Sequence, residues 1–171
     1  MKLLSSLKAF VVPGALLGAM LLTVPAWATL GDNAASVLTD QAHLQGSTLN
    51  STDKSTYVLH EISTSWGKIR EYVSPGGAVF AIAWDGQFKP NLQQLMGPYY
   101  EQARQARQAQ AAEAAQAAQT SGGPVVHMRR APVVIQTSGL VVYETGHMRS
   151  FHGVAYIPQL IPQGVQPSDI R

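Results

Sequence analysis

The sequence contains no cysteine among its 171 residues. A fold held together by disulfides is therefore excluded, and so is lipid attachment through a cysteine at a new N-terminus. The usual cysteine-containing zinc spacings are missing for the same reason. A domain without such links depends on its hydrophobic core for stability.

Charge of one sign is not in excess once the N-terminal segment is set aside. Lys2 and Lys8 account for two of the twelve Lys and Arg residues, which leaves ten to balance the ten Asp and Glu. A neutral domain has no general field that attracts polyanions, so nucleic acid is not expected as a partner. No long apolar run follows residue 28, and we expect no stable membrane span after signal cleavage.

The first 28 residues have the three-part layout of a secretory signal peptide. A basic start leads into an apolar run from Ala9 to Val24, which ends at the small-residue site Ala26-Trp27-Ala28. The run has about 16 residues, short of the roughly 20 that a membrane span needs, although an uncleaved N-terminal anchor is the alternative. We expect cleavage between Ala28 and Thr29 and a periplasmic or secreted location for the rest of the chain.

Composition divides the remaining chain into a domain and a tail. Residues 29–157 are expected to form a single α+β domain, with an exposed Ala/Gln-rich helix extension at 103–119 and a linker at 120–124. Residues 158–171 contain three prolines and few apolar residues. This composition predicts a flexible, Pro-rich tail.

Three segments rich in β-branched and aromatic residues predict an antiparallel meander, at 56–62, 68–73 and 78–84. If Val73 faces Ala78, one face of the second and third strands collects the bulky apolar residues. That face would carry Ile69, Glu71, Val73, Phe80, Ile82 and Trp84, and a slip of one residue would re-sort it. Glu71 is the one charged residue on this otherwise apolar face.

Apolar residues recur at helical spacing after Asn91, which could cap the N-terminus. Gly97-Pro98 interrupts the pattern and predicts a kink, or a fresh helix with Pro98 at its first position. Beyond Ala103 the helix has no large side chain to bury, so its distal half is expected to overhang the domain.

The segments outside these two regions carry weaker patterns. Residues 34–44 could form a short helix behind Asp32 or Asn33, and 47–55 is expected to be a loop. Short strands at 125–126 and 133–135 and a closing hairpin of 140–143 with 148–157, across Thr145-Gly146, complete the pattern. The predicted fold is α+β: an antiparallel sheet of about five or six strands with one long helix packed across one face.

No catalytic motif emerges from the sequence. The five histidines are scattered without ligand spacing, so no metal site and no cofactor are expected. No serine lies in a nucleophile elbow or a recognisable triad context. Glu61 and Glu71 occupy adjacent predicted strands and could meet as an acid/base pair, but such carboxylates are more often solvated or salt-bridged.

Glu71, Tyr72 and Trp84 are the candidate ligand- or partner-binding residues. Glu71 would be a carboxylate in a pocket beside Trp84, or else a sheet-edge residue paired with Lys68, Arg70 or the C-terminal hairpin. Tyr72 and Trp84 would form an aromatic recognition surface, or belong to the core as aromatics of small β-rich domains usually do.

The run from Ile69 to Trp84, followed by Pro90-Asn91-Leu92, Leu95, Gly97 and Tyr99-Tyr100, resembles the exported bacterial proteins grouped as domain of unknown function 2844. Residues 26–31 and Asp40-Gln41-Ala42 are also similar, and the resemblance covers Leu30 to Tyr100. The chain departs from the family pattern at Gly86-Gln87 and Asn91. The resemblance implies an exported protein and supplies no catalytic residues.

Three functions are compatible with these observations. We expect a non-catalytic periplasmic module that binds another envelope protein or a small ligand. The alternatives are a carboxylate-dependent hydrolase or isomerase with a Trp-lined pocket, and a structural component of the cell envelope.

Overall fold

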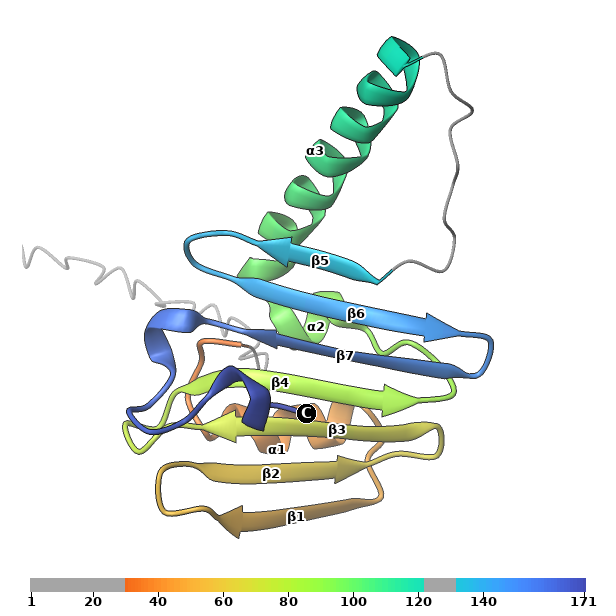
Figure 1. Ribbon diagram of the computed structural model, residues 1–171. Helices are drawn as coiled ribbons and strands as arrows, with labels where there is room; N and C mark the ends of the chain where they lie inside the picture. The colour runs from red at the N-terminus through yellow and green to blue at the C-terminus, as the bar shows by residue number, and fades with distance from the viewer. Residues whose placement is uncertain (1–29, 122–131) are drawn as a thin grey trace, which may run out of the picture.

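The computed structural model describes residues 30–121 and 132–171, which form a seven-stranded antiparallel sheet with helices on one face (Figure 1). The expected signal peptide, the expected strand at 125–126 and all of the expected linker 120–124 except its first two residues lie outside the described residues; residues 120 and 121 are the last two of α3. Across the sheet the strands run in the order β1-β2-β3-β4-β7-β6-β5. Their bounds are β1 Thr48–Asp53, β2 Val58–Ser63, β3 Gly67–Val73, β4 Val79–Gly86, β5 Val133–Gln136, β6 Val141–His147 and β7 Ser150–Tyr156.

The strand order divides the sheet into two meanders that meet where β4 pairs with β7. The first contains the three predicted strands and adds β1, where the sequence analysis placed a loop. That loop prediction was wrong because β1 is an edge strand, exposed along most of its length, so its polar sequence has no apolar alternation. The second meander contains the predicted hairpin, with its turn at Met148-Arg149 rather than at Thr145-Gly146.

The pairing of β3 with β4 contains a bulge that changes the predicted face of one residue. Ile69 pairs with Trp84 and Glu71 with Ile82, so these four residues share a face as predicted. The register shifts between Tyr72 and Val73, and Phe80 therefore joins Tyr72 on the opposite face. The prediction that Phe80 lies beside Ile82 and Trp84 was wrong for this reason.

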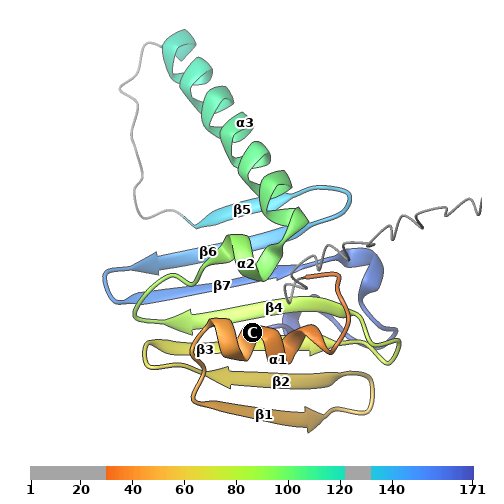
Figure 2. The same ribbon diagram turned by 180° about the vertical axis from the view of Figure 1, so that it is seen from behind.

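Three helices lie on the face behind the sheet in Figure 1 and in front of it in Figure 2: α1 Ser36–His43, α2 Leu92–Met96 and α3 Pro98–Ser121. Asn91 caps α2, as predicted, by accepting a hydrogen bond from the Gln94 backbone N–H at 3.2 Å. Gly97 takes a positive φ of 49° and α3 begins at Pro98, which confirms the predicted fresh helix. No helix among the described residues has the length and hydrophobicity to cross a membrane.

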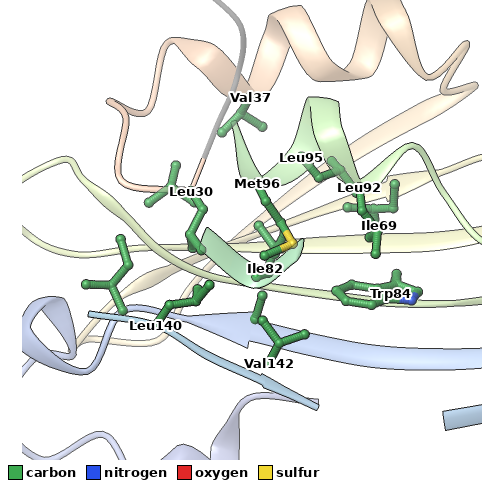
Figure 3. Packing of buried hydrophobic residues seen from close by; sticks show 14 of the residues in the cluster. Leu30, Val37, Ile69, Ile82, Trp84, Leu92, Leu95, Met96, Leu140 and Val142 are labelled. Atoms are coloured by element: carbon green, nitrogen blue, oxygen red, sulfur yellow. The ribbon is translucent and has the colours of Figure 1, made fainter. Parts of the chain in front are cut away.

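The helix face, defined as the side of the sheet that α1 and α2 cover, holds the larger hydrophobic core. Figure 3 shows Leu92, Leu95 and Met96 of α2 close above Ile69, Ile82 and Trp84 of the sheet. The helical stripe therefore packs on the sheet as the sequence predicted. After Ala106, α3 leaves this core and most of its residues are exposed, as expected for the helix extension.

The tail face, defined as the opposite side of the sheet, is covered by residues 158–171 (Figure 1). This segment contains two short 3₁₀ helices, η1 Pro158–Leu160 and η2 Pro167–Asp169. Val165 and Ile170 are buried against Tyr72, Phe80, Ala81 and Ala83. The structure thus places the segment predicted as a flexible tail against the sheet, where its apolar side chains and the hydrogen bonds between Tyr72 and Arg171 hold it over the aromatic residues.

Candidate functional site

Glu71 lies in the middle of the helix face and is 1% exposed. It belongs to β3, the third strand of the sheet, and its neighbours across the strands are His60 on β2 and Ile82 on β4. Glu71 is not a sheet-edge residue, because β3 is not an edge strand. It is not paired with Lys68 or Arg70 either, because these two residues form ion pairs with other carboxylates. A carboxyl group so placed needs a polar partner from the helices.

Two helices supply that partner. Asp40 lies one turn after the buried Val37 on α1, so the same helical face carries both toward the sheet, and Asp40 is 1% exposed. Gln94 of α2 is also buried and donates a hydrogen bond from Nε2 to Asp40 Oδ1 at 2.9 Å. Asp40, Glu71 and Gln94 therefore form a buried polar cluster between α1, α2 and β3.

The cluster joins two carboxyl groups whose pKa values are both raised. Glu71 accepts no hydrogen bond from an N–H or hydroxyl group of the described residues, and its side-chain hydrogen bond is with Asp40. Burial, then the Asp40 charge and this hydrogen bond, raise the pKa of Glu71 well above 4.5. Burial also raises the pKa of Asp40, to about 6, against the lowering effect of hydrogen bonds from Glu71 and Gln94. Asp40 is therefore the first of the two to ionise as the pH rises, and Glu71 keeps its proton to higher pH.

The neighbours of this cluster do not complete a nucleophilic triad. Ser51 Oγ lies 2.7 Å from His60 Nδ1, and His60 pairs directly with Glu71 across the strands. Glu71 makes no hydrogen bond with His60, so the carboxyl group does not orient the imidazole. In the described part of the chain, no three His, Asp or Glu side chains are arranged to hold a metal ion.

The remaining residues singled out from the sequence are dispersed. Trp84 is on the helix face, two residues along the sheet from Glu71, and its indole lies over Gly153, where a Cβ would overlap the six-membered ring. Tyr72 lies on the tail face, where its hydroxyl donates to the Arg171 carbonyl at 2.8 Å. Glu61 also belongs to the tail face and pairs with Lys68 and Arg70. The structure thus separates Glu61 from Glu71.

A cleft of about 280 Å³ opens on the helix face between α2, the start of α3 and strands β5 and β6. Its apolar lining continues the core and consists of Pro90, Leu92, Met96, Tyr100, Ala103, Ile135 and Val142. The charged residues of its lining are Lys89, Arg104, Arg107 and Glu144. We call this hollow the basic cleft, because three cations face a single carboxylate there.

Ion pairs order the charged lining of the basic cleft. Glu144 forms two ion pairs: its Oε1 lies 2.6 Å from Lys89 Nζ, and its Oε2 lies 3.1 Å from Arg107 Nη2. Arg104 is held by Glu101, one turn earlier on α3, through two hydrogen bonds of 2.8 and 2.6 Å. The Glu144 side chain is 13% exposed, whereas Lys89 and Arg107 are 35% and 45% exposed and remain open to solvent.

Sequence reasoning missed Asp40, Gln94 and Glu144. Asp40 stands at helical spacing behind Val37 and before Leu44, and this pattern could have marked it as an inward-facing carboxyl group. Gln94 lies between Leu92 and Leu95 in the apolar stripe of α2. Glu144 carries no such signal, because its partners lie 37 and 55 residues away in the sequence.

The fold and these sites define a class: an α+β protein with a fully antiparallel sheet, helices over one face and a C-terminal segment over the other. The chain belongs to the family described as "Protein of unknown function (DUF2844)", which it matches over residues 26–170. The match extends well beyond residues 30–100, where the sequence motifs lie. No curated protein and no solved structure matches the chain.

Proposed function

We propose that this protein is an exported, non-catalytic binding module of the periplasm, and that the basic cleft is its ligand site. Export is supported by the basic start, apolar run and small-residue site of residues 1–28. The observation that carries the binding function is the cleft itself. It combines an apolar floor with a few charged groups, which is the usual composition of small-molecule sites.

The dimensions of the basic cleft fit a small ligand. Its volume of about 280 Å³ lies just below the range of about 300–1,000 Å³ typical of ligand pockets. Its walls come from α2, α3, β5 and β6, which belong to the packed body of the domain. A site built on such rigid elements needs little reorganisation to bind, and this favours affinity.

A hydrolase or isomerase that uses Glu71 has weaker support. α1 and α2 close over the carboxyl pair, and neither Glu71 nor Asp40 lines a cleft described for this structure. A general acid or base must come within hydrogen-bond reach of its substrate. We therefore assign the Asp40–Glu71 pair to the docking of α1 on the sheet rather than to chemistry.

A screen of small soluble fragments by ligand-detected NMR tests the binding function. Gln93 is exposed at the rim of the basic cleft, so Gln93→Trp should obstruct the cleft without disturbing the core. Gln108→Trp is the matched control, because Gln108 is exposed on α3 and does not line the cleft. We expect fragments that bind the wild type to lose binding in Gln93→Trp and keep it in Gln108→Trp. Equal binding to both variants would refute the assignment.

Export is tested separately on the full-length chain. After expression in a Gram-negative host, osmotic shock should release the protein, and intact-mass measurement should show a chain that begins at Thr29. Replacing Ala26 and Ala28 by bulky residues should block processing. A protein that stays in the cytoplasmic fraction with residues 1–28 attached would contradict the proposal.

A further inference from the structure

We infer that the basic cleft takes a small amphipathic anion: a carboxylate or phosphate head on a short apolar chain. This inference rests on the proposed function and adds the chemical class of the ligand. Two features of the cleft carry it, the geometry of its cations and the nature of its floor.

The cations of the cleft are spaced for an oxyanion. Lys89 comes from the segment before α2 and Arg107 from α3, yet both reach the same carboxylate, one on each oxygen of Glu144. Two positive groups that can bridge one carboxylate can also hold a second one beside it. Neither is saturated by Glu144, since an ammonium has three N–H donors and a guanidinium five.

The charge balance also favours an anion. Arg104 is neutralised by Glu101, which leaves Lys89 and Arg107 against Glu144 alone. The set therefore carries one excess positive charge at the mouth of the cleft. Lys89 and Arg107 are both partly exposed, so an incoming head group reaches them without the cost of burying a new charge.

The floor of the cleft selects against a purely inorganic ion. Leu92 and Met96 from α2 and Ile135 and Val142 from the sheet present side chains with no hydrogen-bonding group of their own. Burying an alkyl chain against them contributes about 0.8 kcal/mol for each CH₂ group. An anion without an apolar part forgoes this contribution, so acetate or inorganic phosphate should bind weakly.

Titration calorimetry with eight-carbon probes tests the inference on the wild-type chain. Octanoate and octyl phosphate should bind at least tenfold more tightly than octanol, octylammonium or acetate, and their affinity should fall as salt is added. The ratio of octanoate to octyl phosphate shows which head group the cations prefer. Lys89→Gln and Arg107→Gln should each weaken octanoate about tenfold, while Lys54→Gln, an exposed control outside the cleft, should have no effect.

Glu144→Gln should raise the affinity for octanoate, whereas Lys89→Gln and Arg107→Gln should lower it. The variant removes the competing carboxylate and leaves Lys89 and Arg107 free, so octanoate should bind several-fold more tightly than to the wild type. Octanol or octylammonium binding as tightly as octanoate, but not to Gln93→Trp, would overturn the ligand class and leave the proposed function intact. Octanoate binding that persists in Gln93→Trp would overturn both. Absence of octanoate binding at millimolar concentration would overturn the ligand class alone if fragments still bind the cleft.

Discussion

Two glutamates on opposite faces of the sheet have pKa values that are shifted in opposite directions. Glu61 and Glu71 lie on neighbouring strands, but Glu61 points to the tail face and Glu71 to the helix face. Hydrogen bonding to Lys68, followed by smaller effects of Lys68 and Arg70, lowers the pKa of Glu61. Burial and the proximity of Asp40 raise the pKa of Glu71 well above 4.5. What covers a face thus decides the charge of the carboxyl group on it.

The difference reflects how each face is covered. On the helix face, α1 and α2 close over the sheet, and their polar side chains must find partners within the core. On the tail face the covering segment is short, and the aromatic cluster of Tyr57, Tyr72 and Phe80 fills the space. The charges there stay at the margin, where solvent and counter-ions reach them.

The largest expected effect is the loss of Trp84 from the helix face. Trp84→Ala removes a fully buried indole that covers Gly153, and it should lower the free energy of unfolding by about 3–5 kcal/mol. Urea denaturation followed by circular dichroism measures the change. Trp66→Ala is the control, because Trp66 is only partly buried, and it should cost less. Equal costs for the two variants would show that the full burial of Trp84 contributes no more to stability than the partial burial of Trp66 on the same face.

Glu71→Gln should stabilise the protein at alkaline pH. Folding raises the pKa of both Asp40 and Glu71, so the folded chain binds more protons and stability falls as pH rises. For Asp40 the loss extends from its ordinary pKa of 3.8 to about 6, and for Glu71 it begins at the ordinary pKa of 4.5 and extends well above it. An amide at position 71 donates to ionised Asp40 without a second charge. Thermal unfolding at pH 8 should show a gain of about 1–3 kcal/mol.

The pH dependence of that gain separates it from a general packing effect. The advantage of Glu71→Gln should narrow as the pH falls toward 4, where the wild-type pair is fully protonated. Glu61→Gln is the matched control on the tail face. The pKa of Glu61 is lowered on folding, so its contribution is present above pH 4.5 and lost in acid, and its removal should cost little at pH 8. A constant gain for Glu71→Gln at every pH would contradict the raised pKa values of Asp40 and Glu71.

A smaller effect is expected where the C-terminal segment meets the tail face. The Tyr72 hydroxyl donates to the Arg171 carbonyl at 2.8 Å and accepts from the Arg171 N–H at 3.0 Å. Tyr72→Phe keeps the ring in the aromatic cluster and removes both bonds, so it should cost about 1–2 kcal/mol. Tyr143→Phe, at an exposed ring, should cost almost nothing. Hydrogen exchange should show the loss concentrated in residues 158–171, and an unchanged segment would argue against this anchor.

The central strands and the helical stripe could be predicted because their signals are local. Enrichment in β-branched and aromatic residues predicted β2 to β4, and the spacing of Leu92, Leu95 and Met96 predicted the packing face of α2. The edge strand β1 could not be predicted, since its partner β2 supplies the hydrogen bonds and its side chains need no apolar pattern. The bulge that turns Phe80 to the tail face left no mark in the sequence either.

The candidate sites divide in the same way. Glu71 broke the apolar pattern of its strand and could be singled out, but its partner Asp40 comes from a helix 31 residues earlier, and only the packed fold brings them together. The buried anchor of the C-terminal segment depends on Val165 and Ile170, two isolated apolar residues in a polar stretch. Long-range contacts of this kind have no periodicity from which to predict them.

The smallest expected effect marks where the helix face ends along α3. Ala103 is buried in the core, whereas Ala112 is exposed on the part of the helix that projects past β5. Glycine costs about 1 kcal/mol in a helix interior, but a fraying end can absorb this cost locally. Ala112→Gly should therefore change the global free energy of unfolding by less than about 0.5 kcal/mol, while Ala103→Gly should cost more than about 1 kcal/mol. Equal costs would place the distal half of α3 within the cooperative unit and extend the helix face beyond the sheet.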